Sequence, residues 1–437
     1  MLPLDTIARM SRSLWILPFI FAAMGHGQSP CPHNALPQAA RRVSSLQQEL
    51  LKIKSSEMDS AVVPAAADKI AQLKDALSLA SDAAMACEGP SIDVAQLQVR
   101  LARVLHANQP EPTESPSDGT IKDDVAGLYG TDLQVKARRP SGAAELINIE
   151  YSIDAGCGSD SMLLVYQLYD ATWKQKLRWQ SPPLKMISDA FGDFFVFTIL
   201  RDPTGQAGRD DSWRVVVAHG TPWCQSRFSD FAIDVLAPGP VPASPRVLWH
   251  TEREYSRGDF DARIKSSGNM FELRLNADCM TFDNVNCFER RVIYRYVVDA
   301  GDSVHRVEPM GLNARGFVEE WLTAPWSESE TFAATPSGQS LREAHDSFDP
   351  KFPESDNKFV SHSFGPVRAC TEAGVSQIQM NSILVKMVPG KPGGDSTPLP
   401  SLYFHVREVK GGYLMLSAPT APDPTCSGPD LMPSTIN

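Results

Sequence analysis

The spacing of apolar residues changes near residue 145, and this change limits the fold more than any other feature of the chain. Before it, apolar side chains recur every three or four residues, as on one face of a helix. After it, they alternate with polar residues, as in a strand with one buried face. The sequence therefore predicts an α+β protein, with a small N-terminal helical unit followed by a mostly-β region that is sandwich-like or an irregular antiparallel sheet.

Residues 35–107 carry three separate apolar stripes of helical spacing. The stripes are Val43, Leu46, Leu50 and Ile53, then Ile70, Leu73 and Leu77, then Leu97, Leu101 and Val104. Ser91 is expected to be the N-cap of the third helix, with Asp93 in its first turn. A partner-binding coiled coil would need several unbroken heptads. We therefore expect a compact three-helix unit instead.

The region after residue 145 contains at least ten short runs rich in branched and aromatic residues, separated by turn residues. Two helical segments, Arg315–Leu322 and Ser340–Phe348, interrupt these runs. Strand–turn–strand units recur at unequal intervals. A β-propeller would repeat more regularly, so the pattern favours a sandwich or an open sheet over a propeller.

The composition along the chain predicts five segments. They are a signal peptide (1–27), a helical unit (28–107), a polar Pro-rich linker (108–124), a β-rich domain (125–240) and a second β-rich region with short helices (241–437). Residues 237–245 contain four prolines, which lack backbone donors. This spacer is either a domain boundary or a long loop.

Residues 11–27 have the layout of a cleavable signal peptide. Arg12 precedes an apolar core over Leu14–Met24, and small residues follow up to Gly27. The core is shorter than the roughly 20 apolar residues that span a bilayer. Met10 would give a more typical start, because Asp5 is unusual so early in a signal. We expect a secreted or periplasmic protein without a transmembrane helix in the mature chain, and the lack of an N-glycosylation acceptor suits a bacterial source.

The net charge of −11 makes nucleic acid a poor partner, because an acidic surface repels phosphates. The 437 residues contain eight cysteines, all after the predicted signal, which predicts disulfides in an oxidising compartment. The expected pairs are Cys31 with Cys87, Cys157 with Cys224, Cys279 with Cys287, and Cys370 with Cys426. No cysteine or histidine has the spacing of a zinc site, so no metal or cofactor is predicted.

The expected pair of Cys279 with Cys287 conflicts with the strand register that the flanking apolar residues favour. If Cys279 directly opposes Cys287 across a hairpin, Phe271 faces Arg295 and Leu275 faces Arg291. The apolar face sets strand register, so either a one-residue bulge intervenes or the two cysteines pair elsewhere.

Two polar clusters are weak candidates for a binding site. His219 lies five residues before Cys224, although the intervening Gly-Thr-Pro predicts a turn. His250, Glu252 and Glu254 alternate along a strand and would share one face, which suits cation binding or acid–base chemistry as well as a solvated surface. The loop from Asp202 to Asp211 has too few carboxylates for calcium.

No recognised hydrolase motif or phosphate-binding glycine loop is present. We expect a non-enzymatic binding or interaction module of the cell envelope or exterior, whose ligand is an unknown protein or glycan. The alternative is a secreted hydrolase of an unrecognised type. That alternative requires two of His219, His250, Glu252 and Asp202 to converge with shifted pKa values.

Overall fold

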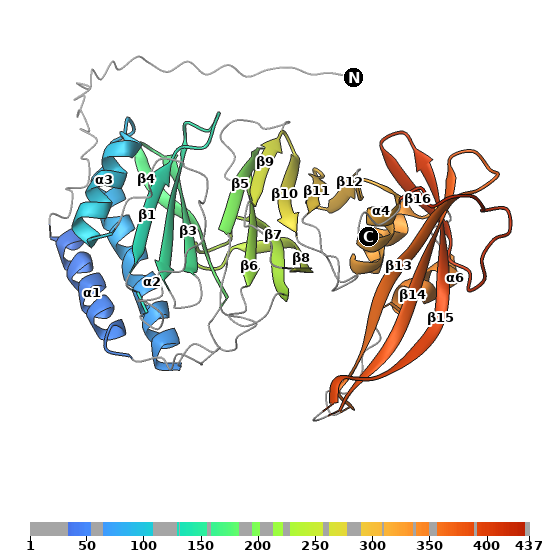
Figure 1. Cartoon of the computed structure of the whole chain (residues 1–437). Helices are drawn as coiled ribbons and strands as arrows, with labels where there is room; N and C mark the ends of the chain where they lie inside the picture. The colour runs from blue at the N-terminus through green and yellow to red at the C-terminus, as the bar shows by residue number, and fades with distance from the viewer. Residues whose placement is uncertain are drawn as a thin grey trace, which may run out of the picture.

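The computed structural model describes fourteen segments of the chain. They are 34–53, 64–107, 129–130, 132–154, 159–182, 195–201, 213–221, 228–256, 262–277, 290–307, 310–334, 338–348, 356–388 and 391–432. The predicted signal peptide (1–27) and linker (108–124) lie outside these residues. Within them the protein is mostly β, with four antiparallel sheets and a few helices (Figure 1).

Three helices form the predicted N-terminal unit. They are α1 (Ala35–Leu50), α2 (Pro64–Met85) and α3 (Val94–Leu105). The predicted stripes point inward: Leu46, Leu73 and Leu101 are completely buried. Each such side chain contributes about 1.5–3 kcal/mol when it leaves water. The predicted cap was wrong by two residues, because Asp93 accepts hydrogen bonds from the backbone N–H groups of Ala95 and Gln96 and is therefore the N-cap of α3.

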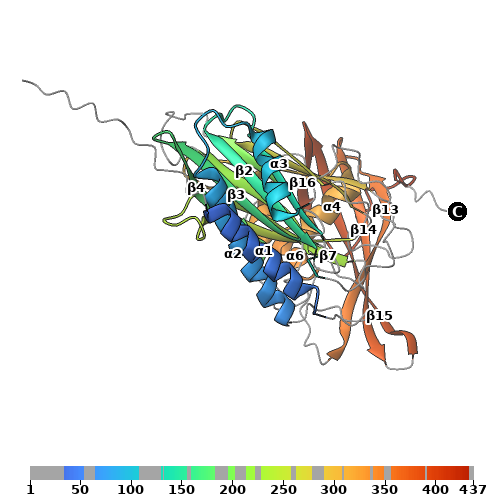
Figure 2. The same cartoon turned by 90° about the vertical axis from the view of Figure 1, so that its left-hand side faces the viewer.

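The helical unit covers one face of the first sheet, which we call sheet A. Its strands are β1 (Leu133–Arg138), β2 (Leu146–Asp154), β3 (Ser159–Tyr169) and β4 (Thr172–Gln180). Figure 2 shows α1 and α2 lying in front of the sheet. Tyr151, Ile153 and Leu164 share one buried cluster with the helices. The helices are thus part of the core of sheet A and not a separate bundle.

Sheet B packs on the other face of sheet A. Its strands are β5 (Phe195–Arg201), β6 (Trp213–Thr221), β7 (Phe228–Ala237) and β8 (Arg246–Ser256). Leu163 and Trp179 of sheet A share a buried cluster with Val215 and Val217 of sheet B. The Pro-rich residues 237–245 join β7 to β8, which pair in this sheet. The spacer is therefore a long loop inside sheet B.

Sheet C packs on the far face of sheet B. Its strands are β9 (Arg263–Ser267), β10 (Met270–Ala277), β11 (Arg290–Val298) and β12 (Val304–Val307). Phe271 pairs with Tyr296, and Leu275 with Val292. This register differs by one residue from the one that would place Cys279 opposite Cys287, as the apolar pattern requires. Both cysteines lie outside the described residues.

Sheet D and four short helical turns form the C-terminal part. The strands are β13 (Lys358–Ala369), β14 (Val375–Val388), β15 (Lys391–Val409) and β16 (Gly412–Ser417). The helices are α4 (Ala314–Thr323), α5 (Trp326–Ser329), η2 (Glu330–Phe332) and α6 (Gln339–Asp346). Phe317 and Trp321 of α4 pack on Phe404 of β15. The sequence predicted α4 and α6 closely but not the full length of β13–β15.

The described cysteines are all oxidised. Cys370 and Cys426 form a disulfide, which is the pairing that the sequence suggests. Cys87 is also disulfide-bonded. Its partner lies outside the described residues, as do Cys31, Cys157, Cys224, Cys279 and Cys287, so the pairing of Cys31 with Cys87 stays a prediction. None of the described helices is long and apolar enough to cross a membrane.

Candidate functional site

Three adjacent strands of sheet B bring four ionisable side chains to the face that packs toward sheet A. In the register of β6 and β7, Asp234 pairs with Val217, whose side chain is buried between the two sheets. His250 of β8 pairs with Asp234. Side chains alternate along a strand, so His219 and Glu252 lie on this same face. We call His219, Asp234, His250 and Glu252 the acid–histidine ladder.

Asp234 is the centre of the ladder. Its Oδ1 lies 2.6 Å from Nδ1 of His250, and its Oδ2 lies 3.4 Å from Nε2 of His219. Nε2 of His250 lies 3.2 Å from Oε1 of Glu252. The indole Nε1 of Trp179 donates to Oδ2 of Asp234 over 3.4 Å. The four ladder groups therefore form one continuous chain of polar contacts.

The ladder runs from the interior to the surface. The side chains of His219 and Asp234 are 7% and 12% exposed, whereas those of His250 and Glu252 are 47% and 75% exposed. The buried end lies against aromatic rings, since Trp179 contacts the ring of His219 and stacks on Phe195. The outer end lies on β8, an edge strand of sheet B. A ligand in solvent can therefore reach His250 and Glu252.

The ladder shifts the pKa values of its central members in opposite directions. Burial alone would raise the pKa of Asp234, but contacts with His219 and His250 outweigh it and lower the pKa. Burial alone would lower the pKa of His250, but the carboxylates of Asp234 and Glu252 outweigh it and raise the pKa. Both shifts favour the charged forms, a carboxylate beside an imidazolium.

The structure brings together three of the residues singled out from the sequence, His219, His250 and Glu252. The side chain of Glu254 and all of Asp202 lie outside the described part of the chain. Asp234, which joins the other three, was missed by sequence reasoning. Its signal was a single acid inside the apolar run of β7, between Ile233 and Val235. An acid at such a position is buried, and a buried charge needs partners.

The geometry of His250 limits what it can do chemically. A carboxylate only accepts hydrogen bonds, so each ring nitrogen of His250 must carry a proton to bond its acid. In a catalytic triad one nitrogen faces an acid and the other faces the nucleophile. Here both nitrogens face acids. In this arrangement both ring nitrogens of His250 donate to acids, which is the hydrogen-bonding pattern of an imidazolium.

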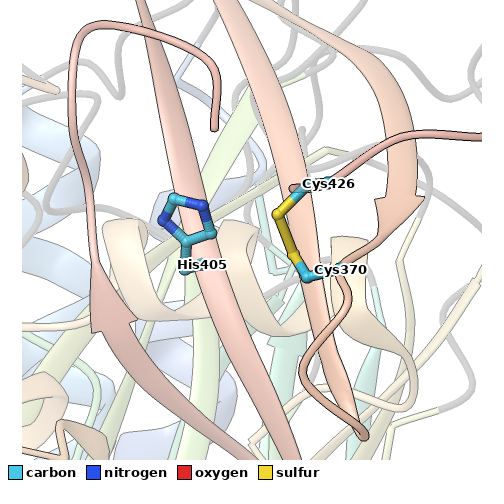
Figure 3. A group of neighbouring side chains, drawn as sticks. All are labelled: Cys370, His405 and Cys426. Carbon is cyan, nitrogen blue, oxygen red and sulfur yellow. A yellow bond between two sulfur atoms is a disulfide. The ribbon is translucent and has the colours of Figure 1, made fainter. Parts of the chain in front are cut away.

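A second compact cluster surrounds the disulfide in sheet D (Figure 3). One ring nitrogen of His405 and the sulfur atoms of Cys370 and Cys426 lie within 4.8 Å of one another. The thiolate is the form that binds metals, and the disulfide removes it. His405 also contacts Ser417 Oγ through Nδ1 and Gln377 Nε2 through Nε2, both at 2.9 Å. We interpret this cluster as a structural staple beside a buried, hydrogen-bonded histidine.

A third cluster lies where sheets B and C meet the helices, and we call its members Arg253, Arg306, Glu320 and Glu328 the junction cluster. Nη2 of Arg306 lies 2.6 Å from Oε2 of Glu320, and Nη2 of Arg253 lies 2.6 Å from Oε2 of Glu328. Arg306 also donates to Glu328. All four side chains are at most 9% exposed. Its two arginines and two glutamates balance in charge and join β8 and β12 to α4 and α5.

Comparison with known proteins adds no identification, because neither a protein family model nor a curated protein sequence matches the chain.

Proposed function

We propose that the chain is an exported, non-enzymatic binding module that works in the bacterial periplasm, at the cell envelope or outside the cell, where it contacts a protein or glycan. The oxidised state of Cys87, Cys370 and Cys426 supports an oxidising compartment. The layered sheets, sandwich-like in their packing, give a rigid support. The acid–histidine ladder is the ligand-contacting site of this proposal.

The observation that carries the non-enzymatic assignment is the position of His250 between two acids. Its Nδ1 and Nε2 lie 2.6 and 3.2 Å from carboxylate oxygens. A general base needs a nitrogen within reach of the proton that it removes. The ladder offers instead an exposed, acidic surface on an edge strand, which suits recognition of a cationic group.

The experiment that tests this function combines location with turnover. The full chain is expressed in a bacterial host, and osmotic-shock and cytoplasmic fractions are compared by immunodetection. The purified protein is then assayed with chromogenic ester, peptide and glycoside substrates, beside His250→Gln as the matched variant. We expect the protein in the shock fraction and equal, background turnover for both proteins. Cytoplasmic retention, or turnover that His250→Gln abolishes, would contradict the proposal.

A secreted hydrolase is the second candidate function, and one observation favours it. His219, His250 and Glu252 converge through Asp234, and two groups of the ladder have shifted pKa values. That convergence is the condition that the sequence set for a hydrolase. The turnover assay distinguishes the two functions. A hydrolase would turn over substrate and lose that activity in His250→Gln, whereas a binding module would show only background turnover in both proteins.

A further inference from the structure

Asp234 differs from two other buried acids, Asp160 and Glu320, in the charge that balances it. Asp160 contacts Lys74, and Glu320 contacts Arg306, so each has a permanent cation. Among the described residues, the side chain of Asp234 contacts His219, His250 and Trp179. A buried carboxylate without a partner charge is costly. Its environment is therefore built for a cation that is exchangeable, either a proton on histidine or an ion.

The donor atoms at the outer end of the ladder are those that bind transition metals. His250 Nδ1 and Asp234 Oδ1 already face each other, and Glu252 Oε1 lies beside the other ring nitrogen. Imidazole and carboxylate together suit Zn²⁺ and its neighbours in the first transition row, whereas Ca²⁺ takes oxygen ligands. Imidazole and carboxylate ligands can bind such an ion without a cysteine ligand. The three donors come from the adjacent strands β7 and β8, with Asp234 at Nδ1 of His250 and Glu252 at Nε2, so Glu252 must move to share one ion with Asp234.

The inner end of the ladder supplies the support that metal-binding carboxylates have in proteins. Oδ2 of Asp234 receives His219 Nε2 and Trp179 Nε1, each at 3.4 Å. These contacts leave Oδ1 directed toward His250. Groups that hold a ligating side chain in place typically change metal affinity by about 10- to 100-fold. In a metal site built on Oδ1 of Asp234, His219 would therefore position the carboxylate and His250 would be a ligand.

We propose that the acid–histidine ladder is a binding site for a divalent transition-metal ion of the zinc type, with Asp234, His250 and Glu252 as protein ligands and water completing the coordination. The inference rests on the proposed binding function and names the ligand class of that same site. The ion enters between Nδ1 of His250 and Oδ1 of Asp234, and the proton that it displaces from the imidazole goes to solvent. The exposed side chain of Glu252 rotates to become the third ligand.

The test is titration of the chelator-treated, disulfide-intact full chain with Zn²⁺ by calorimetry and with Co²⁺ by visible absorption. We expect one saturable Zn²⁺ site per chain and a Co²⁺ absorption band in the visible region. His250→Gln and Glu252→Gln should each weaken binding at least about tenfold. His305→Gln is the matched control, because His305 also lies near an acid, Asp299, but on sheet C. It should bind like the parent, and Ca²⁺ should not compete.

The absence of saturable Zn²⁺ binding, or equal affinity in Glu252→Gln and the parent, would overturn the metal site. Glu252 is mostly exposed, so loss of folding does not explain a change in that variant. The metal site and the proposed binding function can each fail without the other. An exported protein without turnover and without a Zn²⁺ site contradicts the metal inference alone. A Zn²⁺ site together with hydrolysis that depends on His250 contradicts the binding function alone.

Discussion

Lys74 of α2 and Asp160 of β3 form an ion pair in the interior, with Nζ 3.0 Å from Oδ1 and side chains that are 4% and 0% exposed. The pair joins the helical layer to sheet A. Removing one member of a buried pair leaves an uncompensated charge, which typically costs about 3–5 kcal/mol. We therefore expect Lys74→Met to lower the free energy of unfolding by that amount, measured by urea denaturation followed by circular dichroism.

Two further variants complete this prediction. The double variant Lys74→Met with Asp160→Leu should recover much of the loss, because no charge remains buried. Arg342→Met breaks an exposed pair with Asp346 and should change stability by less than about 1 kcal/mol. Equal losses for Lys74→Met and Arg342→Met would show that burial does not govern the Lys74–Asp160 pair.

The disulfide between Cys370 and Cys426 closes a loop with a sequence separation of 56 residues. Loop-closure entropy predicts that such a cross-link stabilises the fold by about 4 kcal/mol, with measured effects often smaller. We expect the double variant Cys370→Ser, Cys426→Ser to unfold at a lower denaturant concentration without reducing agent. An unchanged midpoint would mean that the segment around Cys426, beyond β16, is held beside the end of β13 without the disulfide.

The N-cap of α3 offers a test with a matched control two residues away. Asp93→Ala removes the acceptor for two backbone N–H groups and should cost about 1 kcal/mol. Ser91→Ala should change stability by less than about 0.5 kcal/mol, since Ser91 is exposed and does not cap the helix. Thermal or urea denaturation measures both. If Ser91→Ala lowered the stability more than Asp93→Ala did, Ser91 would be the N-cap, as the sequence suggested.

Glu272 of β10 gives a pH dependence. Burial alone would raise its pKa, but hydrogen bonds from Arg295 and Arg274 outweigh burial and hold the pKa below the usual value. Its stabilising contribution is therefore present above the unfolded pKa of about 4.3 and is lost as pH falls through the folded pKa. The difference in unfolding free energy between the parent and Glu272→Gln should be constant near neutral pH and shrink on acidification. A difference that grows below pH 4.3 would contradict this sign.

The sequence predicts the fold class and many strands, because strands such as β2 and β6 alternate or run apolar. It indicates β4 only as the second half of a strand–turn–strand unit, because polar and charged residues separate Trp173, Leu177 and Trp179 and a bulge shifts the pairing with β3. Proline at 392, 398 and 400 also hides the first half of β15. That half extends beyond the pairing with β16, and an open edge tolerates residues without a backbone donor.

The candidate site was predicted in its exposed half and missed at its centre. His250 and Glu252 are polar residues on an alternating strand, and the sequence places them on one face. Asp234 joins them only through the register between β7 and β8, which depends on a bulge near Leu236 that one strand alone does not encode. The register between two strands cannot be read from one strand alone. The sequence therefore indicated His250 and Glu252 of β8 but not Asp234 of β7, which contacts His250.

Export is the central claim, because the oxidised cysteines and the proposed site of action both depend on it. The most direct measurement is the intact mass of the protein recovered from its native host, denatured in the presence of a thiol-alkylating reagent without reductant. We predict a chain that has lost its first residues, up to about Gly27, and that takes up no alkyl group. A full-length chain with alkylated cysteines, found in the cytoplasm, would contradict the account.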